Sequence, residues 1–594
     1  MTDMQQPPMP ELPHSLASIQ EKSQKLIAEY LERREQDDGY RVLDPMVISK
    51  TFQETVIKAM SKPEAWMGEQ MALWSDYLEL WKRTTERVLM NKETEPVAAP
   101  APDDKRFKDD LWVKNYLFDF MKQCYLLTSR HVQSAVKQVE GLDPHTAKKV
   151  AFYTRQMVDA LSPGNFATTN PQVLKATLES GGENLLKGLS HMLEDLERGK
   201  GKLRLKLTDL NAFRLGENIA ATPGKVVFQN DLMQLLQFDP STEKVRKTPL
   251  LITPPWINKF YILDLKPKNS FIKWAVDQGH TVFVISWVNP DESLAHKSFA
   301  DYLLEGPLAA LDAIEQATGE KQANIVGYCI GGTLIAGTLA YMAAKRDNRA
   351  KSATFFTSLV DFSDVGELSV FIDEEQLQLM EHHMNQKGYL EGSHMADAFN
   401  LLRENDLIWS VVINNYLLGR EPMPFDLLYW NSDSTRMPAA MHSFYLRNMY
   451  QRNLLKQPGG ITLAGVAIDL RKIKVPLYFL STREDHIAPW KSTYGGTQLV
   501  SGPVRFVLGG SGHIAGVINP PQAKKYCYWT NEQLPKDPEQ WLAGAAQHEG
   551  SWWDDWAKWA AQFTGKQVPI RKPGGGKLRP IENAPGSYVK LRIS

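Results

Sequence analysis

The apolar and polar positions of the chain follow two different periods, which change at about residue 205. Before that point, apolar residues recur at spacings of three and four, as is typical of amphipathic helices. Turns at Asp143-Pro144 and at Ser162-Pro163 divide this part, and no repeat of roughly 20–50 residues is visible in it. The pattern predicts a mainly α-helical region over residues 1–205, within which residues 1–95 are poorly specified.

One apolar stripe in this region has two interpretations. Its members follow one another at alternating spacings of four and three residues and are Met67, Met71, Trp74, Leu78 and Trp81, with Leu73, Tyr77 and Leu80 beside them. The first interpretation is a helix that packs on its own protein. The second is a seam between copies or a face that adsorbs to an apolar surface, which tryptophan favours because its ring is apolar and its N–H is polar.

After about residue 205, short β-branched runs alternate with helical segments. The candidate strands are residues 250–253, 281–286, 324–326, 354–359, 477–481 and 504–508. Most of them are continuous apolar runs, as expected of strands that are buried on both faces. The alternation of strands with helices predicts an α/β fold around a mostly parallel sheet over residues 206–594.

Three segments interrupt these patterns. Residues 95–102 are rich in proline and predict a stiff linker. Residues 361–473 separate two candidate strands, and an insertion of this length predicts a cap over the active edge of the sheet. The basic segment 565–594 is either a solvated tail or a docking segment, because residues 588–593 alternate as an edge strand does.

Composition narrows the class of protein. The chain has 68 Lys and Arg against 69 Asp and Glu, and this balance argues against a nucleic-acid-binding protein. Residues 1–15 hold no apolar core and no run of about 18 apolar residues occurs, so we expect neither a signal peptide nor a transmembrane segment. Cys124, Cys329 and Cys527 cannot build a disulfide framework, which favours a reducing, cytoplasmic compartment.

The segment NIVGYCIGGT, residues 324–333, carries the clearest chemical signal. A candidate strand ends in G-x-C-x-G and a helix-like run follows, which is the nucleophile elbow with Cys in place of Ser. The pattern predicts that Cys329 lies at a helix N-terminus, where the dipole and the free N–H groups stabilise a thiolate. Alone, G-x-C-x-G is a weak pattern, and its strand and helix neighbours supply the support.

An elbow nucleophile in this fold requires an acid and then a histidine later in the chain. Asp485 follows the candidate strand 477–481, and His513 ends the glycine-rich loop after strand 504–508. Glu484 is the competing carboxylate, and His486 is a neighbouring histidine. The order Cys329, Asp485, His513 predicts a catalytic triad on an α/β-hydrolase sheet.

An oxyanion hole requires two backbone N–H donors. One should come from Ile330, directly after the nucleophile. The other should lie just after strand 250–253, where Trp256 is our first choice and Ile257 the second. No cluster of His, Cys and carboxylates has the spacing of metal ligands, and no nucleotide-binding glycine loop is present, so we predict no metal and no cofactor.

The chain resembles the polyhydroxyalkanoate synthases, bacterial polymerases that make polyester from hydroxyacyl-CoA. The segments that carry the resemblance are FYTRQMVDALSPGNF (152–166), TNP (169–171), PPWINK (254–259), GYCIGG (327–332), YWNSDST (429–435) and SGHIAGVINPP (511–521). They extend over residues 105–560, whereas residues 1–95 and the last 30 carry little of the signal. The sequence around Ala515 and the long single chain resemble class I enzymes, which favour short-chain monomers.

The resemblance implies roles for individual residues. Cys329 would accept the acyl group, and His513 would be its base. Asp485 matches a residue that either orients His513 or activates the 3-hydroxyl of the substrate. Trp430, in the cap, matches a position that lines or gates substrate access.

The expected function is polymerisation of (R)-3-hydroxyacyl-CoA thioesters, of short chain such as 3-hydroxybutyryl-CoA, into polyester with release of CoA. The reaction is expected to pass through a covalent acyl-enzyme on the cysteine. The expected partners are this thioester, the growing polyester chain, the surface of a cytoplasmic polyester granule and a second copy in a homodimer. One rival is a thioesterase or polyester depolymerase of the same fold. The other is a granule-coating protein without catalytic activity, against which the intact set Cys329, Asp485 and His513 argues.

Overall fold

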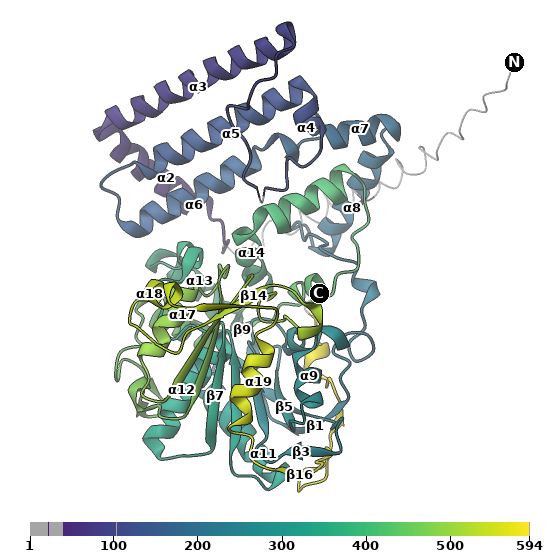
Figure 1. Cartoon of the computed structure of the whole chain (residues 1–594), viewed down its shortest axis with the longest axis vertical. Coiled ribbons are helices and arrows are strands. Elements are labelled where there is room, and N and C mark those ends of the chain that lie inside the picture. Colours follow the sequence, from purple (N-terminus) through teal and green to yellow (C-terminus); the bar gives the residue numbers. More distant parts are fainter. Residues whose placement is uncertain (1–21, 23–39, 103, 593–594) are drawn as a thin grey trace, which may run out of the picture. The chain divides into compact units, whose positions relative to one another are not determined.

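The computed structural model describes residues 22, 40–102 and 104–592, which form two compact units (Figure 1). Unit 1 contains the described residues up to Asp209 together with Phe399–Met423. Unit 2 contains Leu210–Ala398 and the described residues from Pro424 onward. The helical prediction for residues 1–39, apart from residue 22, and the prediction for the end of the tail at residues 593–594 lie outside the described residues. The part of the predicted cap at residues 399–423 clusters with unit 1.

Unit 1 is helical, as its apolar period predicts. Its main helices are α2 (Pro45–Ser61), α3 (Pro63–Met90), α4 (Leu111–Lys114), α5 (Tyr116–Lys137), α6 (Pro144–Ala160), α7 (Pro171–Glu179) and α8 (Glu183–Arg198). The predicted turns are confirmed, because α6 begins at Pro144 and a short 3₁₀ helix occupies Pro163–Asn165. Asp143 caps α6 by accepting hydrogen bonds from the N–H groups of His145 and Thr146.

The apolar residues of α3 fall into two sets, one that packs on the protein itself and one that is exposed. Leu73, Tyr77 and Leu80 pack against α5, where Leu80 is 1% exposed. The five residues at four- and three-residue spacing are 51–70% exposed, and they are Met67, Met71, Trp74, Leu78 and Trp81. Packing on the protein itself therefore accounts only for the residues beside the stripe.

The predicted linker at residues 95–102 is held in place by unit 1. The backbone N–H groups of Val97 and Ala98 both donate to Oε1 of Gln123 on α5, at 2.7 and 3.2 Å. Ala98 is buried in the cluster formed by Leu80 and Leu127. Residues 97 and 98 thus belong to the packed core of α3 and α5.

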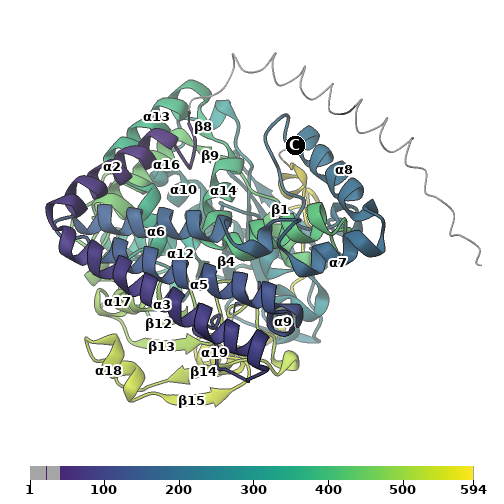
Figure 2. The same ribbon diagram turned by 90° about the horizontal axis from the view of Figure 1, so that it is seen from above.

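Unit 2 is built on one sheet that has 11 strands among the described residues, in the order β15-β14-β13-β12-β7-β6-β4-β5-β2-β1-β17. The bounds of the strands are β1 (Gly224–Gln229), β2 (Met233–Phe238), β4 (Leu250–Thr253), β5 (Val282–Trp287), β6 (Ala323–Tyr328), β7 (Ala350–Phe356), β12 (Leu477–Thr482), β13 (Val504–Gly509), β14 (Cys527–Thr530), β15 (Ala546–Glu549) and β17 (Glu582–Asn583). Strands β12 to β15 lie side by side in Figure 2.

The six strands from β5 to β13 in this order pair in parallel and form the centre of the sheet. All six were predicted as strands, and the parallel α/β-hydrolase architecture is confirmed. The strands that sequence analysis missed flank this centre, and each pairs with its neighbours antiparallel. Because the carboxyl ends of parallel strands meet at one edge, the loops after β4, β6, β12 and β13 converge there.

Helices cover both faces of the sheet, and their bounds are α9 (Phe271–Asp277), α10 (Phe299–Leu303), α11 (Ala309–Thr318), α12 (Ile330–Lys345), α17 (Trp490–Gly495), α18 (Pro538–Ala543) and α19 (Trp553–Ala561). On one face, Phe271 of α9 contacts Trp553 and Trp556 of α19 and Phe356 of β7. On the other face, Phe355 stacks on Phe479 of β12 at 4.6 Å. The alternation of Phe355 and Phe356 shows why both faces of β7 must be apolar.

The segment between β7 and β12 is mainly helical. It contains α13 (Glu374–Lys387), β8 (Tyr389–Leu390), α14 (Gly392–Leu402), α15 (Asp426–Asn431), β9 (Met437–Pro438), α16 (Ala439–Tyr445), β10 (Thr462–Leu463) and β11 (Val466–Ala467). No helix in the described part of the chain is long and apolar enough to cross a membrane.

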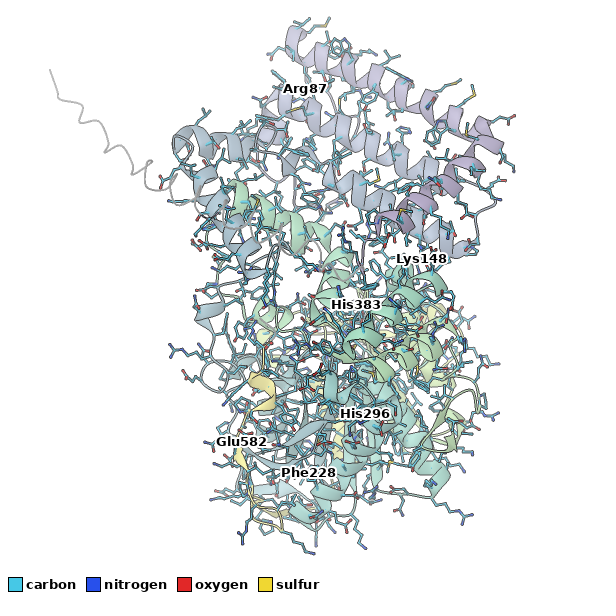
Figure 3. All side chains as sticks on the ribbon, turned by 180° about the vertical axis from the view of Figure 1, so that it is seen from behind. Arg87, Lys148, Phe228, His296, His383 and Glu582 are labelled. Carbon is cyan, nitrogen blue, oxygen red and sulfur yellow. The ribbon has the colours of Figure 1, made fainter. Side chains whose placement is uncertain are left out.

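The basic C-terminal segment is docked, so the interpretation as a solvated tail is wrong. Strand β16 (Gln567–Pro569) pairs with β3 (Lys244–Arg246). Strand β17, which carries Glu582, pairs with β1, which carries Phe228 (Figure 3). The predicted edge strand is also wrong over its first residues, because Tyr588–Lys590 forms the 3₁₀ helix η15.

Candidate active site

Cys329 stands at the sharp turn between β6 and α12, with φ of +52° and ψ of −125°. Its N–H donates to the carbonyl of Phe356 at 2.9 Å, which fixes the turn to the neighbouring strand. A Cβ atom on Gly331 would lie 2.2 Å from the carbonyl oxygen of Thr253, and one on Gly327 would lie 2.4 Å from Cα of Gly332. Both glycines are therefore required by close approach of backbone, as the elbow pattern predicts.

The structure brings His513 and Asp485 together at the same edge of the sheet. Nδ1 of His513 lies 2.7 Å from Oδ2 of Asp485. Oδ1 of Asp485 accepts hydrogen bonds from the N–H groups of Ile487 and Ala488 at 2.9 and 2.8 Å. The acid side chain is 0% exposed and the histidine side chain 7%, so the pair is shielded from water.

The charge state of His513 depends on its neighbours. Burial, the largest influence, disfavours the imidazolium, but Asp485 and then Cys329 outweigh it through charge and hydrogen bonding and raise the pKa of His513 to about 10. The arrangement suits a cysteine nucleophile that is paired with its base.

The two competing candidates are placed differently from the pair. Glu484 is exposed, and its backbone N–H donates to the carbonyl of Ser511 at 3.0 Å. His513 pairs with Asp485, and Cys329 is among the groups that raise its pKa. The geometry therefore favours Asp485 and His513 as the acid and base.

Ile330 and Trp256 stay the predicted donors of the oxyanion hole, on two segments that contact each other. The Cβ position of Gly331 is also 2.8 Å from the carbonyl oxygen of Pro254, so the loop after β4 touches the first turn of α12. The N–H groups of Trp256 and Ile330 donate to no other residue that the structure describes. They are thus available for a ligand, and Ile257 is the alternative donor on the same loop.

The loop that carries Trp256 is held from several sides. Nε1 of Trp287 donates to the carbonyl of Pro254 at 2.9 Å, and the ring of Trp256 packs on that of Tyr302 at 4.7 Å. The hydroxyl of Thr435 donates to the carbonyls of Trp256 and Ile257. These contacts fix the backbone of the loop.

Trp430 lies in the main core of unit 2 and is buried. Its Nε1 donates to the carbonyl of Lys259 at 2.7 Å, which ties the cap segment to the loop of Trp256. A role of Trp430 in substrate access stays a prediction.

Sequence analysis missed an aromatic group of the cap beside Cys329. Burial is the largest influence that raises the pKa of Tyr445 and of Tyr450, and the charge of Cys329 raises both further, after that of Tyr450 in the case of Tyr445. Phe362 packs on both rings at 6.1 and 5.0 Å. The enrichment of aromatic residues in the cap was the only sequence signal for them.

The other two cysteines lie in a different environment. Burial raises the pKa of both Cys124 and Cys527, which opposes a thiolate at neutral pH. Among the described residues, no group of three or more His, Cys, Asp and Glu side chains is arranged to hold a metal ion.

Comparison with known proteins gives two family matches. Residues 103–275 match the family described as the N-terminus of poly-beta-hydroxybutyrate polymerase, and residues 256–520 match the alpha/beta hydrolase fold. The chain is 53% identical to a poly(3-hydroxyalkanoate) polymerase subunit of Rhizobium meliloti, over 91% of this chain and 88% of that protein. It is 44% identical to the corresponding subunit of Cupriavidus necator, over 88% of each. A monoacylglycerol lipase of Paleococcus ferrophilus aligns over 47% of this chain and 88% of its own, with 12% identity and a TM-score of 0.30.

Proposed function

The chain belongs to the family of the poly(3-hydroxyalkanoate) polymerases, and from that premise we propose its substrate and its mechanism. It is an acyltransferase of the α/β-hydrolase fold that polymerises hydroxyalkanoate units. Its monomers are (R)-3-hydroxyacyl-CoA thioesters with short chains, such as 3-hydroxybutyryl-CoA, and each addition releases CoA. The observation that carries the proposal is the 2.7 Å contact of His513 with Asp485 in a site that also holds Cys329.

In the first step, His513 takes the proton of the Cys329 thiol and Sγ attacks the carbonyl carbon of the thioester. The negative oxygen of the tetrahedral intermediate is stabilised by the N–H groups of Ile330 and Trp256. When the intermediate collapses, the bond to the CoA sulfur breaks and His513 returns the proton to that sulfur. A thioester is exchanged for a thioester, so this step changes the bond energy little.

In the second step, the 3-hydroxyl of a monomer or of a chain attacks the acyl group on Cys329. His513 accepts the hydroxyl proton, an ester bond forms, and the Cys329 sulfur leaves. Asp485 keeps Nδ1 of His513 as the protonated nitrogen, so that Nε2 faces the reacting atoms. An alternative in which Asp485 itself takes the hydroxyl proton would require Oδ2 to leave His513.

Exclusion of water separates this function from its rival, a thioesterase or depolymerase. The side chains of Asp485 and His513 are nearly inaccessible, whereas Cys329, which would carry the acyl group, is partly exposed. A hydroxyl of the substrate can outcompete water only where water is kept from the acyl-enzyme. We therefore propose that the bound substrate and the growing chain keep water from Cys329 during polymerisation.

A single assay tests the proposal. The enzyme is incubated with 3-hydroxybutyryl-CoA while free thiol and turbidity are followed together. We expect both to rise, because CoA release accompanies polymer. Thiol release without turbidity, with free acid as the product, would identify a hydrolase, and absence of both signals would support the inactive granule-coating protein.

We predict that Cys329→Ser lowers polymer formation by roughly 10³-fold or more. A hydroxyl is a far weaker nucleophile than a thiolate at neutral pH, and an oxygen ester is a poorer acyl donor for chain transfer. The measurement is the initial rate of CoA release, with Cys527→Ser as the matched control at a cysteine outside the site. A rate near that of the unmodified enzyme would contradict the role of Cys329.

For its location, the protein is proposed to act in the cytoplasm on the surface of a polyester granule. The exposed residues Met67, Met71, Trp74, Leu78 and Trp81 of α3 support this, because a continuous apolar face of that kind fits an apolar surface. A homodimer is proposed as well, and sedimentation at several protein concentrations tests it.

A further inference from the structure

Lys259 is a buried lysine in the loop that presents Trp256. Its side chain is 3% exposed, and that of its partner Asp433 is 0% exposed. Nζ of Lys259 lies 3.0 Å from Oδ1 of Asp433. Nζ also donates to the carbonyls of Val589 and Leu591, at 2.7 and 2.6 Å. The ammonium thus has two carbonyl acceptors and one carboxylate as its ion-pair partner.

Two of those three partners belong to the C-terminal segment 588–592. This segment is anchored beside Lys259 by a further cation, because the guanidinium of Arg592 lies 4.3 Å from the centre of the Tyr429 ring and donates to Oγ of Ser432 at 3.0 Å. Nδ2 of Asn289 also donates to the carbonyl of Leu591, at 3.4 Å. The C-terminal segment is therefore packed against Lys259 and against Tyr429 and Ser432.

Asp433 connects Lys259 to the residues that hold the oxyanion loop. It accepts a hydrogen bond from the hydroxyl of Tyr261 at 2.7 Å. Two residues further on, the N–H and the hydroxyl of Thr435 donate to the carbonyl of Ile257 at 3.0 and 2.9 Å. Ser434 forms a β-bridge with Asn258. The loop 254–259 is thus tied to Asp433–Thr435 by its backbone and by the side chain of Lys259.

We propose that Lys259 is a positioning residue for acyl transfer, which makes the C-terminal segment part of the device that fixes the oxyanion donor of Trp256. The inference rests on the proposed function, in which that donor stabilises the tetrahedral intermediate. A buried ammonium must keep its partners, so the backbone of Val589 and Leu591 and the side chain of Asp433 set where Lys259 stands. Lys259 is three residues after Trp256, and a shift of about 1 Å in a catalytic group can cost about 100-fold in rate.

Two reactions of Cys329 separate this role from a general structural role. Alkylation by iodoacetamide displaces iodide at a saturated carbon and forms no oxyanion, so it reports on Cys329, His513 and Asp485 alone. Acylation by 3-hydroxybutyryl-CoA in a single turnover forms an oxyanion and requires the donor of Trp256 as well. Every protein in this experiment carries Cys124→Ser and Cys527→Ser as its background, so that Cys329 is the thiol that reacts.

The main variant ends the chain after Ser587. It removes the two carbonyl acceptors together with the buried Val589 and with Arg592, and it leaves the ion pair of Lys259 with Asp433. The alkylation rate therefore serves as the check on folding. The second variant is Lys259→Met, and Lys259→Arg tests rescue by a retained charge. Lys225→Ala is the matched control, because it removes a different contact of the C-terminal segment, that of Lys225 Nζ with Oδ1 of Asn583.

We expect the shortened chain and Lys259→Met each to lose about 100-fold in acylation rate, while the rate of alkylation is unchanged. The arginine variant should recover part of the loss, and the control should keep both rates. Unchanged acylation in the shortened chain would overturn the proposal, and so would an equal change in both reactions, which would indicate local unfolding. A parent protein that is alkylated but never acylated would contradict the proposed function itself.

Discussion

Both carboxylate oxygens of Asp485 have hydrogen-bond partners within the protein. Oδ1 accepts two backbone N–H groups, and Oδ2 contacts Nδ1 of His513 and the hydroxyl of Thr482 at 3.3 Å. A carboxylate held in this way orients the imidazole and has little freedom to reach a substrate hydroxyl. This favours the orienting role among the two that the resemblance implies.

We predict that Asp485→Asn lowers the first release of CoA and the later releases by the same factor, on the order of 10²–10⁴. The amide would favour the wrong tautomer of His513, and both steps depend on that imidazole. Rapid-quench measurement of the CoA burst and of the steady state checks the prediction. A normal burst followed by poor elongation would instead assign Asp485 to the substrate hydroxyl.

The pKa of His513 provides a second test. Because Asp485 and Cys329 together raise it to about 10 against the effect of burial, removal of either should lower it. Asp485→Asn should lower it further than Cys329→Ala, since the aspartate is the stronger of the two influences. Titration of histidine-labelled protein by NMR measures both shifts. An unchanged pKa in Cys329→Ala would show that the sulfur does not interact with the ring.

The positions of Cys329, Asp485 and His513 could be predicted because each follows a parallel strand, in an order that the fold imposes. The hydrogen-bond partners of the two Asp485 oxygens could not be predicted, because they depend on the geometry of backbone turns. Phe362 and Tyr450 reach the site through packing of cap helices, which have no fixed spacing to the strands. Lys259 reads as an ordinary surface residue, since its carbonyl partners at residues 589 and 591 leave no pattern in the sequence.

At the scale of elements, helices α3 and α5 are joined by a histidine between two carboxylates. Nδ1 of His131 lies 2.8 Å from Glu69, and its Nε2 lies 2.7 Å from Asp76. Burial opposes its protonation most, but the bonds to Asp76 and Glu69 outweigh burial and the repulsion by Arg130, so the pKa of His131 is raised. The hydrogen bonds from Ser134 to Glu69 and from His131 to Asp76 are the main causes that lower the pKa of these carboxyls.

The directions of these pKa shifts predict the pH range in which the histidine and the two carboxylates stabilise unit 1. A raised histidine pKa gives stability that is fully present below its ordinary value of 6.5 and is lost as pH rises through the folded value. The lowered carboxyl pKa values give stability that is present above 4.5 for Glu69 and is lost as pH falls. We therefore expect His131→Gln to lower the urea midpoint of unit 1 more at pH 5.5 than at pH 8.5.

The matched control for this prediction is His296→Gln, at an exposed histidine that Figure 3 labels. It should leave the midpoint unchanged at both pH values. Intrinsic tryptophan fluorescence follows the unfolding, because Trp74 and Trp81 belong to α3. An effect of His131→Gln that is the same at both pH values would show that the histidine acts without its charge.

The elements of the sheet could be predicted to different degrees. The central strands are continuous apolar runs because helices cover both of their faces, and all of them were found. Strands β1 and β2 contain polar positions such as Gln229 and Gln237, and β15 is exposed along its whole length. Such strands pair at the flanks of the sheet, where the apolar pattern is weak, so they were missed.

At the scale of the whole molecule, charge gives little attraction to a surface. The formal net charge is −1, so the proposed attachment to a polyester granule would rest on apolar contact. The exposed residues of α3 offer that contact, while Leu73, Tyr77 and Leu80 hold the helix to α5. Deletion of residues 1–95 would remove both faces of α3 and expose the apolar side of α5. Substitution of the exposed face alone is the sharper test.

We predict that the combined substitutions Met71→Gln, Trp74→Ser and Leu78→Gln reduce sedimentation with poly(3-hydroxybutyrate) particles and lengthen the lag of polymerisation. Each exposed side chain of this size contributes roughly 1.5–3 kcal/mol when fully buried, so the loss of three should lower partitioning by at least about tenfold. Single-turnover acylation of Cys329 should be unchanged, because the three residues belong to unit 1 and the site belongs to unit 2.

The control for this prediction replaces three other exposed apolar residues of unit 1, Met157, Leu161 and Leu178, by the same polar types. Equal loss of partitioning in both proteins would show that general hydrophobicity, and not the face of α3, governs attachment. A loss of partitioning accompanied by conversion of dimers to monomers in sedimentation would assign the stripe to a seam between copies. Attachment through α3 requires that the substituted protein keep its oligomeric state and its acylation rate while it stays in the supernatant.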